Sequence, residues 1–71
     1  MYISKWKVVV SKKNNEGKFA FDYKLEYSDK AEAFEVYEQE KKFFGITENK
    51  RFDDEIGGVA ENENTRIRVT F

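Results

Sequence analysis

The chain has 71 residues, a length that predicts one small domain. It contains no Cys and no His, which excludes disulfide bonds, thiolate metal sites and the usual nucleophile–base pairs of hydrolases. The net charge of −1 indicates no particular partner, but residues 28–64 are strongly acidic whereas residues 1–27 and 65–71 are basic.

The first predicted strand covers residues 2–10, where apolar and polar side chains alternate. The face expected to be buried carries Tyr2, Trp6, Val8 and Val10. The opposite face carries Ile3, Lys5, Lys7 and Val9. Residues 11–18 are predicted to form a hairpin loop, because the Asn and Gly residues there tolerate positive φ angles.

The second predicted strand covers residues 19–27 and has the clearest pattern in the chain. Every second side chain is aromatic or leucine, namely Phe19, Phe21, Tyr23, Leu25 and Tyr27. A strict period of two is typical of a strand with one buried face. We therefore expect all of these side chains to face the core.

A helix is predicted over residues 30–44. Asp29 is expected to cap its N-terminus, and Glu32 completes the pattern of a capping box. Helical spacing places one stripe of side chains together: Phe34, Tyr37, Lys41 and Phe44. Gly45 follows directly, at the position where a left-handed residue commonly ends a helix.

The last predicted strand covers residues 65–71. Its side chains expected in the core are Ile67, Val69 and Phe71, and those expected to point away are Arg66, Arg68 and Thr70. The preceding segment, residues 46–64, has no single interpretation. Gly57-Gly58 indicates a turn or bulge, and residues 59–61 fit a fourth strand, while a short helix within the segment is the alternative.

These elements predict an α+β fold with the order ββαβ, or ββαββ if residues 59–61 form a strand. We expect a two-layer sandwich in which one helix packs on one face of a mainly antiparallel sheet. With strands numbered along the chain, the connections allow the orders 2-1-3 and 1-2-3. Order 1-2-3 would place acidic Asp22 and Glu26 between basic strands. Order 2-1-3 makes the valine-rich strand central with antiparallel neighbours, and it is the order we predict.

No residue pattern indicates catalysis. Gly57-Gly58 lacks the spacing and the following Lys-Ser/Thr of a phosphate-binding loop. The acidic run Asp53-Asp54-Glu55 lacks the alternating ligands of a calcium loop, and we interpret it as a solvated loop or helix start. We therefore expect a protein that is not an enzyme and that uses no cofactor and no metal ion.

Two charged surfaces are the candidate binding sites. The candidate partner-binding residues are Lys5, Lys7, Arg66 and Arg68 on the sheet, with Glu35 and Glu38 on the helix. The basic sheet face is also a candidate nucleic-acid site. Sheets that bind RNA usually present exposed aromatic rings, however, whereas the rings of residues 19–27 are expected in the core.

We therefore expect a non-enzymatic protein-binding module, with nucleic-acid binding by the basic sheet face as the alternative. In outline, the architecture resembles that of small phage and mobile-element proteins that bind a host enzyme, and this resemblance implies an inhibitor or regulator. A homodimer formed through a sheet edge or an exposed apolar patch is a further expectation. No apolar run approaches the roughly 20 residues that cross a bilayer, so we expect no membrane association and a soluble, cytoplasmic protein.

Overall fold

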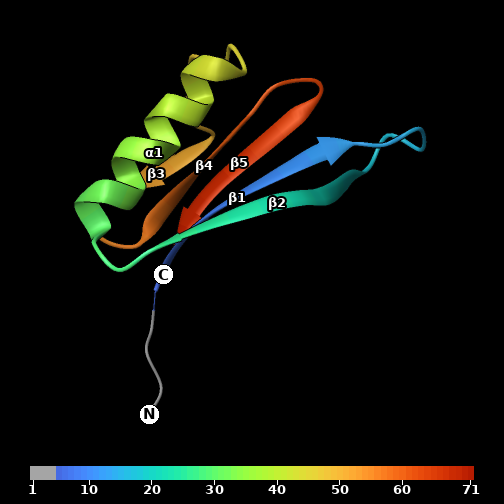
Figure 1. Ribbon diagram of the computed structural model, residues 1–71. Helices are drawn as coiled ribbons and strands as arrows, with labels where there is room; N and C mark the ends of the chain where they lie inside the picture. Colours follow the sequence, from blue (N-terminus) through green and yellow to red (C-terminus); the bar gives the residue numbers. More distant parts are fainter. Residues whose placement is uncertain (1–4) are drawn as a thin grey trace.

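A computed structural model describes residues 5–71 of the chain. The first half contains two strands and one helix: β1 (Trp6–Lys13), β2 (Phe19–Tyr27) and α1 (Lys30–Phe43). The second half contains three strands: β3 (Arg51–Asp53), β4 (Gly57–Glu61) and β5 (Thr65–Thr70). Figure 1 shows the sheet with α1 lying along one side of it.

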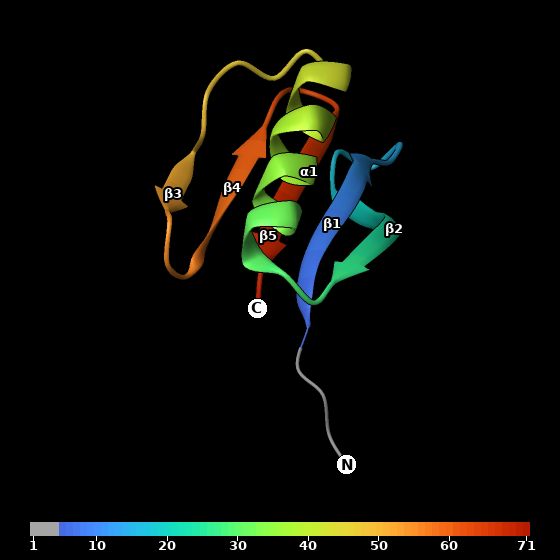
Figure 2. The same ribbon diagram turned by 60° about the vertical axis from the view of Figure 1, so that its left-hand side comes forward.

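The strands form one open antiparallel sheet of five strands in the order β2-β1-β5-β4-β3. Helix α1 packs on one face of the sheet, mainly against β5 and β1 (Figure 2). Among the described residues no other element covers the opposite face, which we call the open face. The α+β class, the single helix and the antiparallel sheet agree with expectation.

The five-stranded order differs from the predicted 2-1-3, and the topologies ββαβ and ββαββ are not confirmed, because residues 46–64 contain two strands rather than at most one. The three strands that were predicted do lie side by side as β2-β1-β5. The pair Gly57-Gly58, interpreted as a turn or bulge, instead begins β4. The turn lies just before it, where the backbone N–H groups of Glu55 and Ile56 donate to Asp53 Oδ1 at 2.8 and 3.3 Å. A carboxylate that accepts from the backbone two residues later is a common turn-forming device. Asp53 of the acidic run thus forms part of this turn.

The ends of the predicted elements also shift. Residues 2–4, placed in the first strand by the sequence, lie outside the described residues. Strand β1 continues to Lys13, so the hairpin loop is shorter than predicted. Within that loop Asn14 Oδ1 accepts from the backbone N–H groups of Glu16 and Lys18. Gly17 has a φ of 78°, which agrees with the expected tolerance of positive φ.

Helix α1 begins and ends close to its predicted bounds. Gly45 has a φ of 73°, as expected for a left-handed residue after a helix. The predicted capping box is wrong: Asp29 is the N-cap residue, but its side chain makes no capping hydrogen bond. Its first turn still gains from acidic Glu32, because negative charge near a helix N-terminus is favourable.

The core lies between α1 and the sheet. It consists of Trp6, Val8, Val10, Ala33, Tyr37, Ile46, Ala60, Ile67 and Val69. Lys41 lies on the same helix stripe and is only 6% exposed. Its Nζ donates to Asn49 Oδ1 at 2.8 Å and to Glu38 Oε1 at 3.3 Å, and Tyr37 Oη donates to the same Asn49 oxygen at 2.7 Å. These bonds replace the water that the buried ammonium and phenol groups lose.

No helix within residues 5–71 combines the length and the apolar character that a bilayer crossing requires.

The close approach of β4 and β5 predicts a strong effect of Gly57→Ala. Gly57 has a φ of 128°, and a Cβ there would collide with the backbone carbonyl oxygen of Val69. Backbone strain and steric overlap together should cost about 3 kcal/mol in the free energy of unfolding, measured by urea titration.

The matched control is Gly17→Ala, because Gly17 also has positive φ but a Cβ there would meet nothing within 4 Å. Its cost should be only about 1 kcal/mol. Equal losses in the two variants would show that the β4–β5 contact is not as close as described.

Candidate functional site

The open face is identified by the strand register. Val8 and Val10 of β1 are fully buried beneath α1, so the alternating side chains of β1 point the other way. Residues directly opposite each other in antiparallel strands share a face. The pairing Val9↔Arg68 therefore places Arg68 on the open face, and Ser11↔Arg66 places Arg66 there too.

A β-bulge changes which side chains of β2 lie on this face. Val10 pairs with Tyr23, whereas the next residue, Ser11, pairs with Phe21, so Asp22 is the extra residue on β2. One extra residue reverses the faces of all positions beyond it. Tyr23, Leu25 and Tyr27 oppose the core residues of β1. Phe19 and Phe21 oppose Lys13 and Ser11 and lie on the open face.

The prediction that all alternating residues of 19–27 face the core is therefore wrong for Phe19 and Phe21. The Phe21 side chain is 66% exposed. The Phe19 ring lies beneath two cations, with Lys13 Nζ 5.1 Å and Arg66 Cζ 4.4 Å from the ring centroid. Both distances are within the range of cation–π attraction. Aromatic rings and basic side chains thus share one surface.

The sequence contains only an indirect signal that Phe19 and Phe21 lie on the open face. A helix of 14 residues is about 21 Å long, whereas a strand of nine residues is about 30 Å long. One helix therefore cannot cover a strand of that length from end to end. The alternation of residues 19–27 runs through Asp22 without interruption, so the position of the bulge could not be read from it.

One row of the open face crosses all five strands. The register aligns Lys24, Val9, Arg68, Val59 and Arg51, which we call the basic row. Four strand spacings make this row about 19 Å long. A second row lies two residues along β1 and contains Phe21, Ser11, Arg66 and Glu61, which we call the aromatic row. The two rows are about 7 Å apart.

A hollow of about 440 Å³ lies at the β3–β5 end of these rows. Its lining residues are Lys50, Arg51, Val59, Glu61, Arg66 and Arg68. Glu61 Oε1 lies 3.2 Å from Lys50 Nζ and 3.5 Å from Arg66 Nη2, so one carboxylate is shared between two cations. Arg51 and Arg68 have no ion pair within the described part of the chain. The hollow therefore keeps an excess of positive charge.

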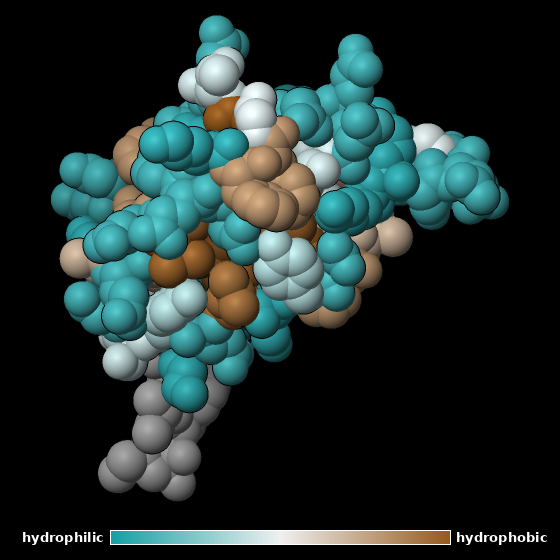
Figure 3. Space-filling view, turned by 45° about the horizontal axis from the view of Figure 1, so that its top comes forward, coloured by the Kyte–Doolittle hydropathy of each residue, from teal (hydrophilic) through white to brown (hydrophobic). Residues whose placement is uncertain are grey.

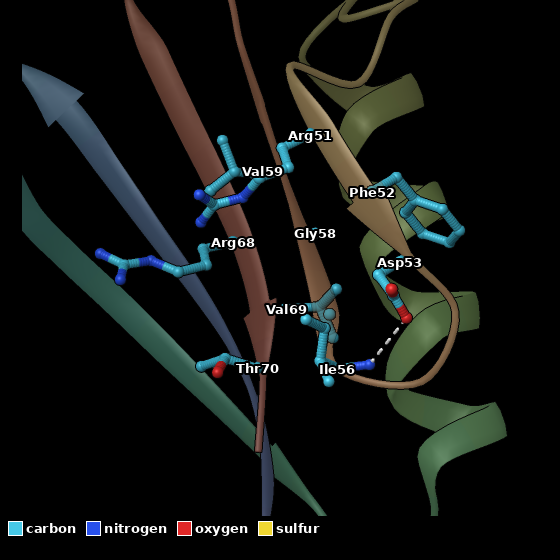
Figure 4. A pocket seen from close by; sticks show the side chains of 10 residues that line it. Arg51, Phe52, Asp53, Ile56, Gly58, Val59, Arg68, Val69 and Thr70 are labelled. Atoms are coloured by element: carbon cyan, nitrogen blue, oxygen red, sulfur yellow. Dashed lines mark hydrogen bonds between the residues drawn. The ribbon is translucent and has the colours of Figure 1, made fainter.

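A neighbouring hollow of about 540 Å³ shares Arg51, Val59 and Arg68 with the first. Figure 4 shows the side chains of Arg51 and Arg68 on the side of the sheet away from α1, while Phe52 points toward the helix. The hollow continues to the turn before β4, where the figure marks the hydrogen bond from the Ile56 backbone to Asp53. Arg68 thus stands between the two hollows.

The structure separates the predicted partner-binding residues into two groups. Lys7, Arg66 and Arg68 lie together on the open face, and Lys5 is exposed immediately before β1. Glu35 and Glu38 are exposed on α1, on the other side of the molecule. Glu35 accepts a 3.4 Å hydrogen bond from Gln39, and Glu38 pairs with Lys41.

Sequence reasoning missed several residues of the open face: Lys13, Phe19, Phe21, Lys50 and Arg51. Lys50 and Arg51 were missed because the strands near them were not recognised, and the other three because of the longer β1 and the bulge. In residues 5–71 no group of three or more His, Cys, Asp or Glu side chains could hold a metal ion.

The groups with clearly shifted pKa values lie on the helix side. Burial raises the pKa of Tyr23 to about 12, with further contributions from its 2.8 Å hydrogen bond to Glu40 and from the charges of Glu40 and Asp22. Burial also raises the pKa of Tyr37 to about 12, and the nearby Glu38 charge adds to the effect. Both phenols therefore stay protonated and act as hydrogen-bond donors to α1 and Asn49.

Comparison of the chain with models of protein families, with curated proteins and with solved structures finds no match. The geometry of the open face is thus the basis for the functional proposal.

The two raised pKa values predict a loss of stability in alkaline solution. The folded protein keeps phenol protons that the unfolded chain releases above the ordinary pKa of 10. The stabilisation is complete below pH 10 and is lost as the pH rises to about 12. The free energy of unfolding, measured by urea titration at a series of pH values, should fall across this window.

The double variant Tyr23→Phe with Tyr37→Phe should show a much shallower fall over the same pH window. Tyr27→Phe, which keeps both bonded phenols, is the matched control and should retain the fall. An unchanged slope in the double variant would contradict the assignment to these two groups.

Proposed function

We propose that the protein is a non-enzymatic binding module whose open face binds nucleic acid. The observation that carries this proposal is the basic row next to the exposed ring of Phe21 on the face that α1 does not cover. Basic side chains supply the sequence-independent attraction to phosphates, and aromatic rings supply contacts to bases. From the sequence, nucleic-acid binding is the alternative hypothesis, and the argument against it is that the aromatic rings of residues 19–27 are expected in the core.

The distribution of charge supports an oriented approach. The acids of α1, including Glu32, Glu35 and Glu38, lie on the side opposite to the basic row. A polyanion is repelled by that side and attracted by the open face, although the net charge of the whole chain is only −1. The polarity of the molecule thus compensates for its low net charge and directs the ligand to one surface.

The non-enzymatic part of the proposal rests on the residue types available. The chain has neither His nor Cys, and the open face combines Lys, Arg, Phe and Val side chains, which bind and position charged or planar groups. The Lys ammonium and Arg guanidinium groups donate hydrogen bonds and accept none, so they serve as anion contacts.

Fluorescence anisotropy with labelled oligonucleotides of about 16 nucleotides tests the proposal. We expect binding at low salt that weakens steeply between about 50 and 200 mM salt, because bound phosphates release counterions. Arg68→Ala and Arg51→Ala should each weaken binding and lower the slope of log affinity against log salt by about 0.7 to 1.

The matched control is Lys42→Ala, which removes one cation from the exposed end of α1. It should leave the affinity and the salt slope nearly unchanged. Absence of binding to any oligonucleotide at low salt, or equal effects of Lys42→Ala and Arg68→Ala, would refute the proposal.

A second candidate function is protein binding through an apolar surface at the opposite edge of the fold. The Trp6 ring contacts both Phe34 and Phe71, and Phe34 contacts Phe52, with ring centroids 5.2 to 5.6 Å apart. Phe71, predicted to point into the core, is 59% exposed, and Phe52 is 43% exposed. Figure 3 shows hydrophobic areas exposed between hydrophilic ones on another face of the molecule.

Such joined apolar residues are typical of surfaces that bind another protein or a second copy of the chain. This candidate retains the expectation of an inhibitor or regulator that occupies a surface of a host protein, and of a homodimer. Both remain proposals.

Affinity capture from cell extract with the tagged protein tests the second candidate. We expect one protein to be enriched by the unmodified chain and lost with Phe71→Lys, because a charge at that position would be buried without a partner in the complex. Phe43→Lys is the matched control, since Phe43 is 77% exposed on the helix and outside the cluster. Equal recovery with Phe71→Lys and Phe43→Lys would exclude this surface.

A further inference from the structure

The β1–β2 hairpin carries an exposed aromatic ring, Phe21, which has no role in a purely electrostatic attraction to phosphates. Phe21 is 66% exposed although it lies in the middle of a paired strand rather than in a loop. Figure 1 shows the hairpin extending past the rest of the sheet and beyond the end of the helix. An aromatic ring held on a strand and open to solvent is suited to contact a planar ligand, because little conformational freedom is lost on binding.

The neighbours of Phe21 on the open face are one small and one basic side chain. Phe21 pairs with Ser11, and Ser11 pairs with Arg66, so a small side chain separates the ring from the guanidinium group. Two strand spacings place their backbones about 10 Å apart. Arg66 is held by Glu61 at 3.5 Å and by stacking over Phe19 at 4.4 Å. Because the Arg66 guanidinium lies over the Phe19 ring, the exposed ring of Phe21 is the aromatic surface that this row offers to a planar base.

The basic row lies beside the aromatic row at the distance that a nucleotide requires. The two rows are separated by about 7 Å, which is comparable to the distance between a phosphate and the base of the same nucleotide. Lys24, Arg68 and Arg51 recur at every second strand of the basic row. Arg68 and Arg51 offer phosphate contacts directly, whereas Lys24 also pairs with Glu26 at 3.6 Å.

We propose that the open face binds single-stranded nucleic acid, with one base stacked on Phe21 above Ser11 and the backbone following the basic row. This inference rests on the proposed function and specifies its ligand. A duplex keeps its bases stacked on one another, so Phe21 has no base face to contact there. An acidic protein segment supplies negative charge but no planar faces, and Phe21 has no role in binding it.

Competition for the wild-type protein distinguishes these ligands. Anisotropy titrations use a single-stranded oligonucleotide, its blunt duplex and a poly-glutamate peptide, each at the same low salt concentration. We expect the single strand to bind about 10-fold or more tightly than the duplex or the peptide at matched charge, because stacking adds to the phosphate contacts.

Phe21→Ala should weaken single-strand binding about 5- to 100-fold without changing the salt slope, since no phosphate contact is removed. Phe21→Tyr should restore binding and Phe21→Leu should not, because tyrosine keeps the aromatic face. Phe43→Ala is the matched control, as it removes an equally exposed ring from the helix. The exposure of Phe21 makes its replacement compatible with folding, which circular dichroism checks.

A direct readout of stacking comes from Phe21→Trp. Its indole fluorescence should be quenched by the single strand, whereas that of Phe43→Trp, the control, should not change. The single native Trp6 is buried and supplies a constant background.

The outcomes separate this inference from the proposed function. Equal binding of single strand and duplex, with no effect of Phe21→Ala but a clear effect of Arg68→Ala, would overturn the stacking site and leave nucleic-acid binding intact. Poly-glutamate binding as tight as that of the single strand would assign the open face to an acidic protein instead. No binding of any oligonucleotide would refute both.

Discussion

The packing of one short helix against a longer sheet is the constraint on which the other features depend. Val8 and Val10 of the interior strand β1 are fully buried because α1 lies over them. The same strand must then present its alternate residues to solvent, since no second helix exists in residues 5–71 to cover them. Towards the hairpin loop the helix ends, and its C-cap residue Phe44 contacts β1 through Lys12, whose Nζ lies 4.6 Å from the ring centroid. There the bulge in β2 turns Phe19 and Phe21 to the open face.

The second half of the chain is tied to the helix by a polar contact at the edge of the core. Asn49 Oδ1 accepts from both Tyr37 and Lys41, and it lies just before the start of β3. The contact satisfies two polar groups on the buried stripe of α1 and positions the chain to enter the sheet edge. Strands β3 and β4 then extend the open face, and Arg51 joins the basic row through its pairing with Val59. The hydrogen bonds of Asn49 on the helix side of the sheet thus help to place Arg51 on the open face.

The separation of charge between the two layers gives the binding proposals their direction. Aromatic and basic side chains meet on the open face, acidic side chains cover α1, and the apolar cluster around Trp6 lies at a further edge. The open face offers positive charge and an aromatic ring, and the apolar cluster offers burial of apolar surface. The acidic side chains of α1 repel a polyanion. The open face combines two attractive interactions at adjacent rows, which is why it leads the functional proposal.

Local patterns in the sequence determined the elements that depend on near neighbours. Alternation indicated the strands around residues 6–10, 19–27 and 65–70, helical spacing indicated α1, and Gly45 indicated its end, because each pattern reflects backbone geometry over a few residues. Only the tertiary structure decided the five-stranded order, the burial of Lys41 and the direction of Phe19 and Phe21. These features depend on which strand pairs with which, at what register and beneath how much helix. A one-residue bulge is invisible in a regular alternation, yet it moves two rings from the expected core to the surface on which the proposed function rests.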